Sequence, residues 1–211
     1  PGGSAYISEQ IWRQVVELKK VKPVVVSMGN VAASGGYYIS CAANKIIAEP
    51  NTLTGSIGIF GMFPNASGLF GKLALTTDIV KTNTFSDLGD LSRPMTESEK
   101  ALIQGYVERG YQTFLSRCAE GRGMTTEAVN AIGQGRVWTG EQAKERGLVD
   151  ELGGIELAIS TAAGLADLDQ YSVTTVSGSK NFLDEFLESQ LGEVKLSIVK
   201  NVLGNEFEYF K

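Results

Sequence analysis

The sequence predicts an α/β fold in which parallel strands alternate with covering helices. Short, continuous apolar runs at residues 23–28 and 45–48 are typical of buried strands. Between and around them, apolar residues recur at helical spacing, and the connections are short. A strand–helix–strand order with short connections indicates βαβ units, in which the strands are parallel.

The N-terminal half supplies most of the expected strands. Ile11, Val15 and Leu18 lie at helical spacing and predict a helix over residues 8–20. Ser34 follows a short turn and opens a compact helix to about residue 43. Residues 82–94 are polar and irregular, which predicts an exposed loop long enough to be functional. Apolar runs predict strands at residues 23–28, 45–48, 54–61 and 77–81.

The C-terminal half is mainly helical, and its helix starts are marked by capping signals. Thr96 and Glu99 form a capping-box pattern before a helix to about residue 120, whose apolar face indicates core or subunit contact. Thr139 and Gln142 repeat that pattern. Further helices are expected at residues 125–132 and 155–166, with a strand-like turn at 148–154. Beyond 168 we expect an extension, with a strand at 171–176 and an amphipathic helix at 181–211.

Composition excludes several classes of function. The net charge is −5 and basic residues form no run, which argues against a nucleic-acid surface. No apolar stretch reaches the roughly 18 to 20 residues of a membrane span. Cys41 and Cys118 are expected to be buried free thiols rather than a disulfide, and with no histidine in the chain they make a poor zinc site. We therefore expect no metal and no cofactor.

Ser34 is the first candidate for chemistry. It is preceded by alanines and followed by Gly35 and Gly36, so the backbone there can pass close to a substrate at a strand-to-helix turn. The N–H of Gly35 and the helix dipole would favour a developing oxyanion. The alternative is an ordinary N-capping serine with small neighbours for tight packing.

Two other glycine-rich segments add to this pattern. Gly2 and Gly3 form a turn just before a helix, where an N–H could donate to an oxyanion, or where the chain simply enters the helix. Ser56 lies on a glycine-rich strand, 22 residues after Ser34, where its hydroxyl could orient a lysine amine. The alternative for that segment is a bulged strand.

A serine nucleophile needs a base, and the chain has no histidine to act as one. A buried, neutral lysine amine would serve, because burial lowers a lysine pKa. The candidates are Lys45, Lys72 and Lys81, and each is more simply a solvated surface charge. Otherwise the base lies on another chain or on a segment outside this sequence.

These motifs together resemble the signal peptide peptidase A (SppA) family, membrane-associated serine proteases. The resemblance covers residues 1–165 in matching order, and the opening Pro1-Gly-Gly-Ser fits the family's Ser-Pro-Gly-Gly turn. The matching segments are Val31-Ala-Ala-Ser-Gly-Gly-Tyr-Tyr, Thr54-Gly-Ser-Ile-Gly, Gly135-Arg-Val-Trp-Thr-Gly, Gly147-Leu-Val-Asp and Leu152-Gly-Gly.

The resemblance implies a Clp protease/crotonase-like fold of stacked βαβ units and a Ser/Lys dyad, which would account for the missing histidine. It places Ser34 at the nucleophile position and Ser56 at the lysine-orienting serine. Gly3 and Gly35 fall on the oxyanion-hole turns, with Gly2 beside them. At the position of the lysine in short family members, this sequence has Ser86 instead.

Long family members split the dyad between tandem domains. We therefore expect residues 1–168 to be the serine-bearing, C-terminal peptidase domain of a longer protein whose N-terminal domain supplies the lysine. The chain begins at Pro1 without Met, which agrees with an excised piece. By itself this piece is expected to be soluble and to have little or no peptidase activity.

The resemblance also implies the setting of the parent protein. Its substrates would be cleaved signal peptides and other apolar peptides. It would be a homo-oligomer at the extracytoplasmic face of the bacterial cell membrane, held there by an N-terminal anchor. Two alternatives remain open: a non-catalytic assembly module of the same fold, and a crotonase-type acyl-CoA enzyme, against which the serine motif argues.

Overall fold

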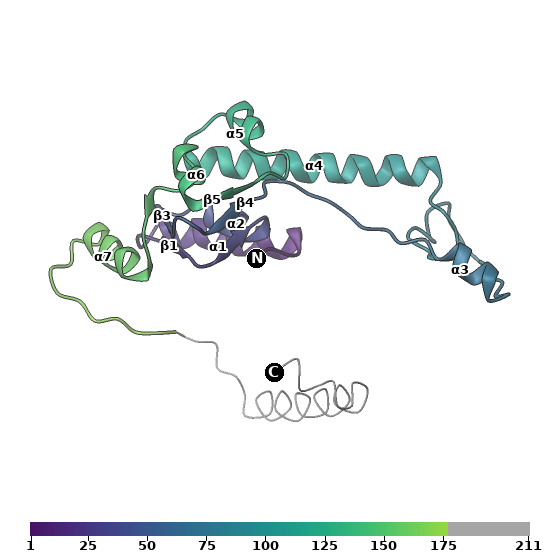
Figure 1. Ribbon diagram of the computed structural model, residues 1–211, viewed down its shortest axis with the longest axis horizontal. Helices are drawn as coiled ribbons and strands as arrows, with labels where there is room; N and C mark the ends of the chain where they lie inside the picture. Colours follow the sequence, from purple (N-terminus) through teal and green to yellow (C-terminus); the bar gives the residue numbers. More distant parts are fainter. Residues whose placement is uncertain (177–211) are drawn as a thin grey trace, which may run out of the picture. The chain divides into compact units, whose positions relative to one another are not determined.

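A computed structural model describes residues 1–176 of the chain. The chain divides into two units, Pro1–Asp169 and Gln170–Lys211. All helices and strands described below belong to the first unit (Figure 1). Residues 171–176 contain no regular secondary structure, so the strand expected there is not found. The helix expected at 181–211 lies outside the described residues.

Two small sheets form the centre of the first unit. Both contain parallel neighbours, as the βαβ pattern predicted, and only the β4–β5 pair is antiparallel. The first sheet has the order β1 (Val25–Met28), β3 (Lys45–Ala48), β6 (Glu151–Leu152). The second has the order β2 (Val31–Ala33), β4 (Leu53–Gly55), β5 (Val137–Thr139).

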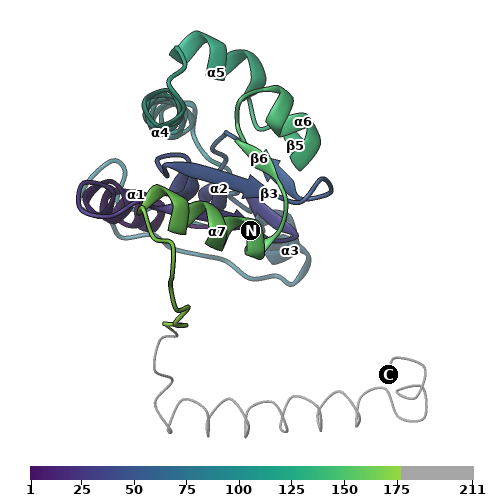
Figure 2. The same cartoon turned by 90° about the vertical axis from the view of Figure 1, so that its left-hand side faces the viewer.

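Helices surround these sheets, and α7 packs on β1 and β3 (Figure 2). Both predicted capping boxes are confirmed, at Thr96 before α4 and at Thr139 before α6. None of the helices within residues 1–176 is long and apolar enough to span a bilayer. The helices are α1 (Ala5–Lys19), α2 (Gly35–Ser40), α3 (Ser67–Lys72), α4 (Glu97–Arg122), α5 (Thr126–Ile132), α6 (Gly140–Glu145) and α7 (Ile155–Leu165).

The predicted α/β class is confirmed, and two strand predictions are corrected. The apolar run at 54–61 leaves the sheet after Gly55, because Gly55 and Ser56 both adopt positive φ angles, 77° and 49°, and turn the chain. Residues 77–81 form no strand. They are exposed and have no neighbouring strand to pair with, so their apolar character has no sheet to enter.

The core lies between α2, α4 and the sheets. Tyr37 and Phe114 are its largest fully buried side chains, and the Tyr37 hydroxyl donates to the Leu148 carbonyl at 3.0 Å. Cys41 and Cys118 are buried free thiols, as predicted, and burial raises the pKa of Cys118 well above its ordinary value. The α2 helix is therefore fixed from beneath by packed apolar groups.

Residues 61–95, which we call the arm, have a different character. No residue of the arm is buried. Figure 1 shows α3, the arm's only helix, beyond the N-terminal end of α4 and away from the sheets. The remainder of the first unit is called the body below.

Candidate active site

Ser34 lies where β2 gives way to α2, in a backbone conformation that L-residues rarely adopt. Its φ and ψ angles are 54° and −120°. Its N–H donates to the Gly55 carbonyl at 2.9 Å, and its carbonyl accepts the N–H of Tyr38 at 2.8 Å. The side chain makes no capping hydrogen bond to α2, so Ser34 is not an ordinary N-cap. Strain of this kind costs about 1–3 kcal/mol and persists where the surroundings enforce it, often at functional sites.

The Gly2–Gly3 turn lies directly against the Ser34 turn. A Cβ added at Gly2 would meet the Cβ of Ser34 at 3.2 Å, and one added at Gly35 would meet the Gly3 nitrogen at 3.2 Å. Gly2 and Gly3 both have positive φ angles, 131° and 149°. The structure thus brings together the three glycines that the sequence singled out, beside the hydroxyl-bearing residue. The first N–H groups of α2 have no partner within the helix and are available to an anion.

Ser56 is the second serine with a positive φ angle, 49°. Its N–H donates to the Arg136 carbonyl at 2.7 Å, which ties this turn to the residues before β5. Because β2 and β4 pair in parallel, with Ala33 opposite Gly55, Ser34 and Ser56 leave the same end of the sheet. Both line one cleft.

Two clefts meet at Ser34, and they share Ser34, Gly58, Ile59 and Phe60. The larger cleft, of about 590 Å³, is bounded by one face of α4 and the turn before β5, and is also lined by Ser56, Gln104, Val107, Glu108, Tyr111, Gln134 and Gly135. The smaller cleft, of about 270 Å³, is also lined by Gly3, Ser4, Ala5, Ser8, Gly35, Tyr38, Tyr106 and Phe114. Glu108 is the only acidic or basic residue among those that line either cleft.

The wall of the larger cleft is held by Tyr111, which sequence reasoning missed. The Gln134 N–H donates to the Tyr111 hydroxyl at 2.9 Å, and that hydroxyl donates to Asn130 Oδ1 at 2.7 Å. Gly135 lies so close to Gly58 that a Cβ added to Gly58 would meet its backbone at 2.9 Å. A sequence signal that could have indicated this wall is the helical spacing of Gln104, Val107, Glu108 and Tyr111 on α4. The sequence prediction considered only the apolar face of that helix, which it assigned to core or subunit contact.

No lysine lines either cleft among the described residues. The Lys45 amine lies 3.7 Å from an oxygen of Asp150, and the Lys81 amine lies 2.9 Å from an oxygen of Asp87. Lys72 belongs to the last turn of α3 in the arm. Ser86 is also in the arm, where its N–H donates to the Asn83 carbonyl at 3.3 Å. The structure therefore brings none of the three lysine candidates to Ser34.

A polar network beside the smaller cleft joins α1, α2 and α4. The Tyr38 hydroxyl donates to Glu9 Oε2 at 2.5 Å, and Arg117 Nη2 lies 2.7 Å from Glu9 Oε1. The Arg117 guanidinium stacks 4.0 Å above the ring of Trp12. Burial and the Glu9 carboxylate raise the pKa of Tyr38, so Tyr38 stays a neutral donor at ordinary pH. Although partial burial opposes it, hydrogen bonds from Arg117 and Tyr38 lower the pKa of Glu9.

Among residues 1–176, no group of three or more cysteine, aspartate or glutamate side chains is placed to hold a metal ion. The arrangement around Ser34 offers a serine hydroxyl on a strained backbone, nearby backbone N–H groups and clefts with apolar side chains in their lining. That combination is typical of nucleophilic acyl transfer.

Comparison with known proteins gives a consistent result. Residues 16–169 match the family model described as "Peptidase family S49". The chain is 40% identical to "Protease 4" of Salmonella typhi over 196 residues, which is 92% of this chain and 32% of that protein. It is 38% identical to "Putative signal peptide peptidase SppA" of Enterococcus faecium, over 91% of this chain and 55% of that protein.

A plant relative matches at similar identity. "Serine protease SPPA, chloroplastic" of Arabidopsis thaliana is 39% identical over 80% of this chain and 25% of that protein. The chain thus spans between a quarter and about half of the length of these relatives.

Two solved structures also match. They are enoyl-CoA hydratase/isomerase proteins from Hyphomonas neptunium and Marinobacter aquaeolei, with TM-scores of 0.37 and 0.40 and identities of 19% and 15%. They cover 74% and 77% of this chain, and 42% and 43% of their own. Similarity at this level carries no argument about the site.

Proposed function

Because the chain belongs to peptidase family S49, we propose that it is the serine-bearing part of a serine peptidase, with Ser34 as the nucleophile. The observation that carries this proposal is the strained conformation of Ser34, whose side chain does not cap α2 and which lies where the two clefts meet. In this proposal the Ser34 oxygen attacks the scissile carbonyl, the leaving amine departs, and water then hydrolyses the acyl-enzyme.

The oxyanion of the tetrahedral intermediate would be stabilised by backbone N–H groups. The Gly35 N–H is at the start of α2, where the helix dipole favours negative charge, and the Gly3 nitrogen lies beside it. Gly2 completes the turn by its close approach to Ser34. Side chains at Gly2 and Gly35 would occupy the space that the two turns share, whereas a Cβ at Gly3 would meet nothing within 4 Å. The close approach of these two turns supports the assignment of the oxyanion hole to them.

The base in this proposal is a lysine from a tandem N-terminal domain of a longer protein, forming a Ser/Lys dyad with Ser34. This is supported by the lysine-free lining of both clefts in the described chain. Ser56 would accept a hydrogen bond from that amine and orient it. The short span of the chain relative to Protease 4 agrees with a larger parent.

The substrates would be signal peptides and other apolar peptides. Ile59, Phe60 and Val107 line the larger cleft, while Tyr106 and Phe114 line the smaller one, so both can receive apolar side chains. Two clefts meeting at the nucleophile fit an extended peptide that continues on both sides of the scissile bond. The printed name of the Enterococcus faecium relative, a signal peptide peptidase, supports this substrate class.

We further propose that the parent protein is a homo-oligomer anchored at the extracytoplasmic face of the bacterial cell membrane. The exposed apolar side chains of the arm support assembly, because a monomer gains nothing by presenting them to water. They include Met62, Leu69, Leu73, Leu75 and Val80. This surface is also the observation that favours the alternative function, a non-catalytic assembly module.

A serine-reactive fluorophosphonate probe distinguishes the two functions. We expect it to label wild-type full-length protein at Ser34, and we expect Ser34→Ala to abolish both labelling and peptide hydrolysis. Ser40→Ala, a serine at the other end of α2, is the matched control and should label normally. Absence of Ser34 labelling in folded full-length protein would leave the assembly module as the better account.

A further inference from the structure

Ser8 is a buried polar residue on α1 that the proposed mechanism does not use. Its side chain belongs to the lining of the smaller cleft, and the residue is only 6% exposed. The Oγ donates to the Ser4 carbonyl at 3.0 Å, which also accepts the Ser8 N–H at 3.0 Å. Ser4 itself caps α1 by accepting the Ile7 N–H. Ser8 is thus tied to the residue that immediately follows the Gly2–Gly3 turn.

The hydroxyl also touches the second turn of the site. A Cβ added to Gly35 would lie 2.6 Å from Ser8 Oγ and 3.2 Å from the Gly3 nitrogen. The Ser8 oxygen therefore fills the space beside the Gly35 Cα that a side chain would otherwise need. Ser8 is thus in contact with Gly35, which carries one proposed oxyanion donor. It is also hydrogen-bonded to Ser4, the residue after Gly3, which carries the other donor.

We propose that Ser8 is a positioning residue for the oxyanion hole, setting the spacing between the Gly3 and Gly35 N–H groups. The inference rests on the proposed peptidase function. Ser8 does not need to touch the reacting atoms. Its volume holds the two turns apart, and its hydrogen bond to Ser4 fixes the turn at the start of α1. Because oxyanion stabilisation depends on donors about 3 Å from the developing charge, a small change in this spacing weakens the transition state more than the bound substrate.

The chain offers a closely matched control in Ser40. Its Oγ donates to the carbonyl four residues earlier, Gly36, at 2.7 Å, and the residue is 4% exposed. Ser40 therefore has the same burial and the same helix back-bond as Ser8, and it lies on the nucleophile's own helix. It lines neither cleft at Ser34. Loss of its hydroxyl tests general weakening of a helix without a change at the glycine turns.

The experiment measures peptide hydrolysis and the rate of fluorophosphonate labelling in the full-length protein. We expect Ser8→Ala to lower kcat and the labelling rate by about 10-fold or more, with KM changed less than about 2-fold, since a misplaced donor costs up to roughly 10²-fold. Ser40→Ala should change both rates by less than about 2-fold.

A second pair of variants separates the hydroxyl from the volume. Ser8→Thr and Ser8→Val add nearly the same bulk, but only threonine keeps the donor to the Ser4 carbonyl. We expect the threonine variant to retain a kcat at least several-fold above that of the valine variant. Equal kcat values in these two variants would overturn the role of the hydrogen bond.

The outcomes also separate this inference from the function on which it rests. If the wild-type protein is never labelled at Ser34, the peptidase proposal fails before Ser8 is tested. If the wild type is labelled and Ser8→Ala reacts equally fast, the peptidase stands and the positioning role fails. Equal losses in Ser8→Ala and Ser40→Ala, or a loss confined to KM, would also overturn it.

Discussion

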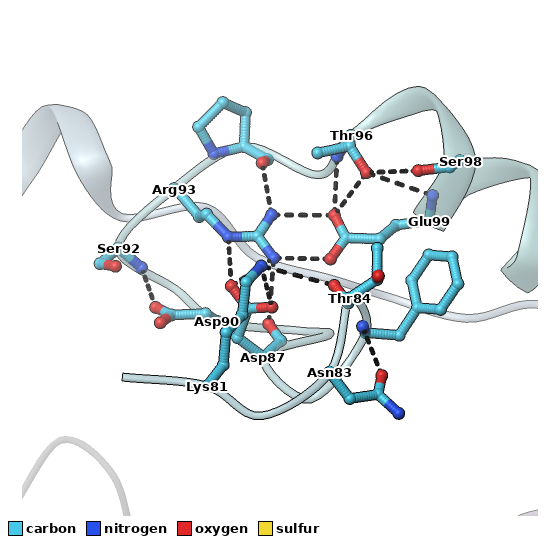
Figure 3. Close-up of polar contacts among 12 residues, drawn as sticks. Lys81, Asn83, Thr84, Asp87, Asp90, Ser92, Arg93, Thr96, Ser98 and Glu99 are labelled. Carbon is cyan, nitrogen blue, oxygen red and sulfur yellow. Dashed lines mark hydrogen bonds and ion pairs between the residues drawn. The ribbon is translucent and has the colours of Figure 1, made fainter. Parts of the chain in front are cut away.

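The body and the arm of this chain are stabilised by different interactions. In the body, fully buried apolar side chains pack under α2, and backbones approach so closely that several glycines have no room for a Cβ. The arm has no buried residue from 61 to 95. It is fastened instead to the start of α4 by ion pairs (Figure 3). Ser34 therefore belongs to the closely packed region.

Arg93 is at the centre of the ion pairs that attach the arm to the start of α4. Its guanidinium makes two hydrogen bonds to Glu99, at 2.8 and 2.6 Å, and its Nε donates to Asp87 Oδ2 at 2.9 Å (Figure 3). Lys81 approaches the same Asp87 from the other side, and the Thr96 N–H donates to Glu99 at 2.8 Å. Two-point contacts between arginine and carboxylate are the strong, directional kind. The arm is thus held by ion pairs, whereas the body is held mainly by close packing of its side chains.

The two regions should therefore be destabilised by different kinds of change. Close packing makes the body sensitive to one added methyl group. The arm tolerates changes in side-chain volume, because its apolar residues already face water, but it should respond to loss of charge and to acid. The following changes test that division, beginning with the largest expected effect.

Gly121→Ala should have the largest effect of this series. A Cβ there would lie 2.2 Å from the Cys41 carbonyl oxygen and 3.0 Å from the Ala42 Cα, and backbone cannot rotate away. We expect a loss of about 3 kcal/mol in the free energy of unfolding, measured by denaturant titration. Gly105→Ala, on the same helix, is the control. Its nearest neighbour is the flexible end of Arg109 at 3.4 Å, so helix propensity should leave it neutral or slightly more stable. Similar midpoints for the two variants would contradict the close packing of α4 on α2.

Arg93→Ala should release the arm without unfolding the body. It leaves Glu99, 1% exposed, without its guanidinium partner. We expect hydrogen exchange at the Thr96 and Glu99 amides to accelerate at least about 10-fold, while the amides of β3 keep their protection. Lys100→Ala, which removes an exposed pair with Glu97, is the control and should change neither set. Loss of protection in β3 would mean that the arm and body unfold as one unit.

Acid should weaken the attachment of the arm to α4, as Arg93→Ala does. Hydrogen bonds from Arg93 and Thr96 lower the pKa of Glu99 from 4.5 to about 2. Since the folded pKa lies below the unfolded one, this stabilisation is fully present above about pH 4.5 and is lost as pH falls toward 2. Exchange at the Thr96 amide, corrected for its intrinsic pH dependence, should therefore accelerate across this window. Glu99→Gln is the control, and a variant with the same acid response would assign the transition to another group.

Much of the body could be predicted from sequence because its signals are local. Capping boxes at Thr96 and Thr139, and the apolar runs of β1 and β3, each specify an element without reference to the rest of the chain. Local glycine-rich motifs also predicted the glycines and serines of the candidate site. What could not be predicted depended on distant partners. The residue pairing of Tyr111 with Gln134 and the back-to-back contact of Gly58 with Gly135 arise only when α4 meets the turn before β5.

The arm was predicted less well for a physical reason. Its apolar residues at 77–81 suggested a strand, yet the described chain supplies no neighbouring strand to pair with them. The ion pairs around Arg93 join residues that are close in sequence, but these residues follow no periodic spacing that would predict the contacts. Periodic sequence patterns indicate which side chains become buried, and no residue of the arm is buried.

Lys81→Ala should have the smallest effect of this series, although it removes one of the original candidates for the base. The Lys81 side chain is 40% exposed, and Asp87 keeps its bonds from Arg93 when the amine is lost. We expect exchange at the Thr96 amide to change by less than about 3-fold, because a half-exposed ion pair contributes little. Ser34 labelling in the full-length protein should not change, since Lys81 is bound to Asp87 in the arm and lines neither cleft. If this chain by itself hydrolysed peptides and the activity disappeared in Lys81→Ala, the base would lie in the arm. The arm would then have to bring Lys81 to Ser34 during catalysis, and the division between a catalytic body and a fastened arm would be wrong.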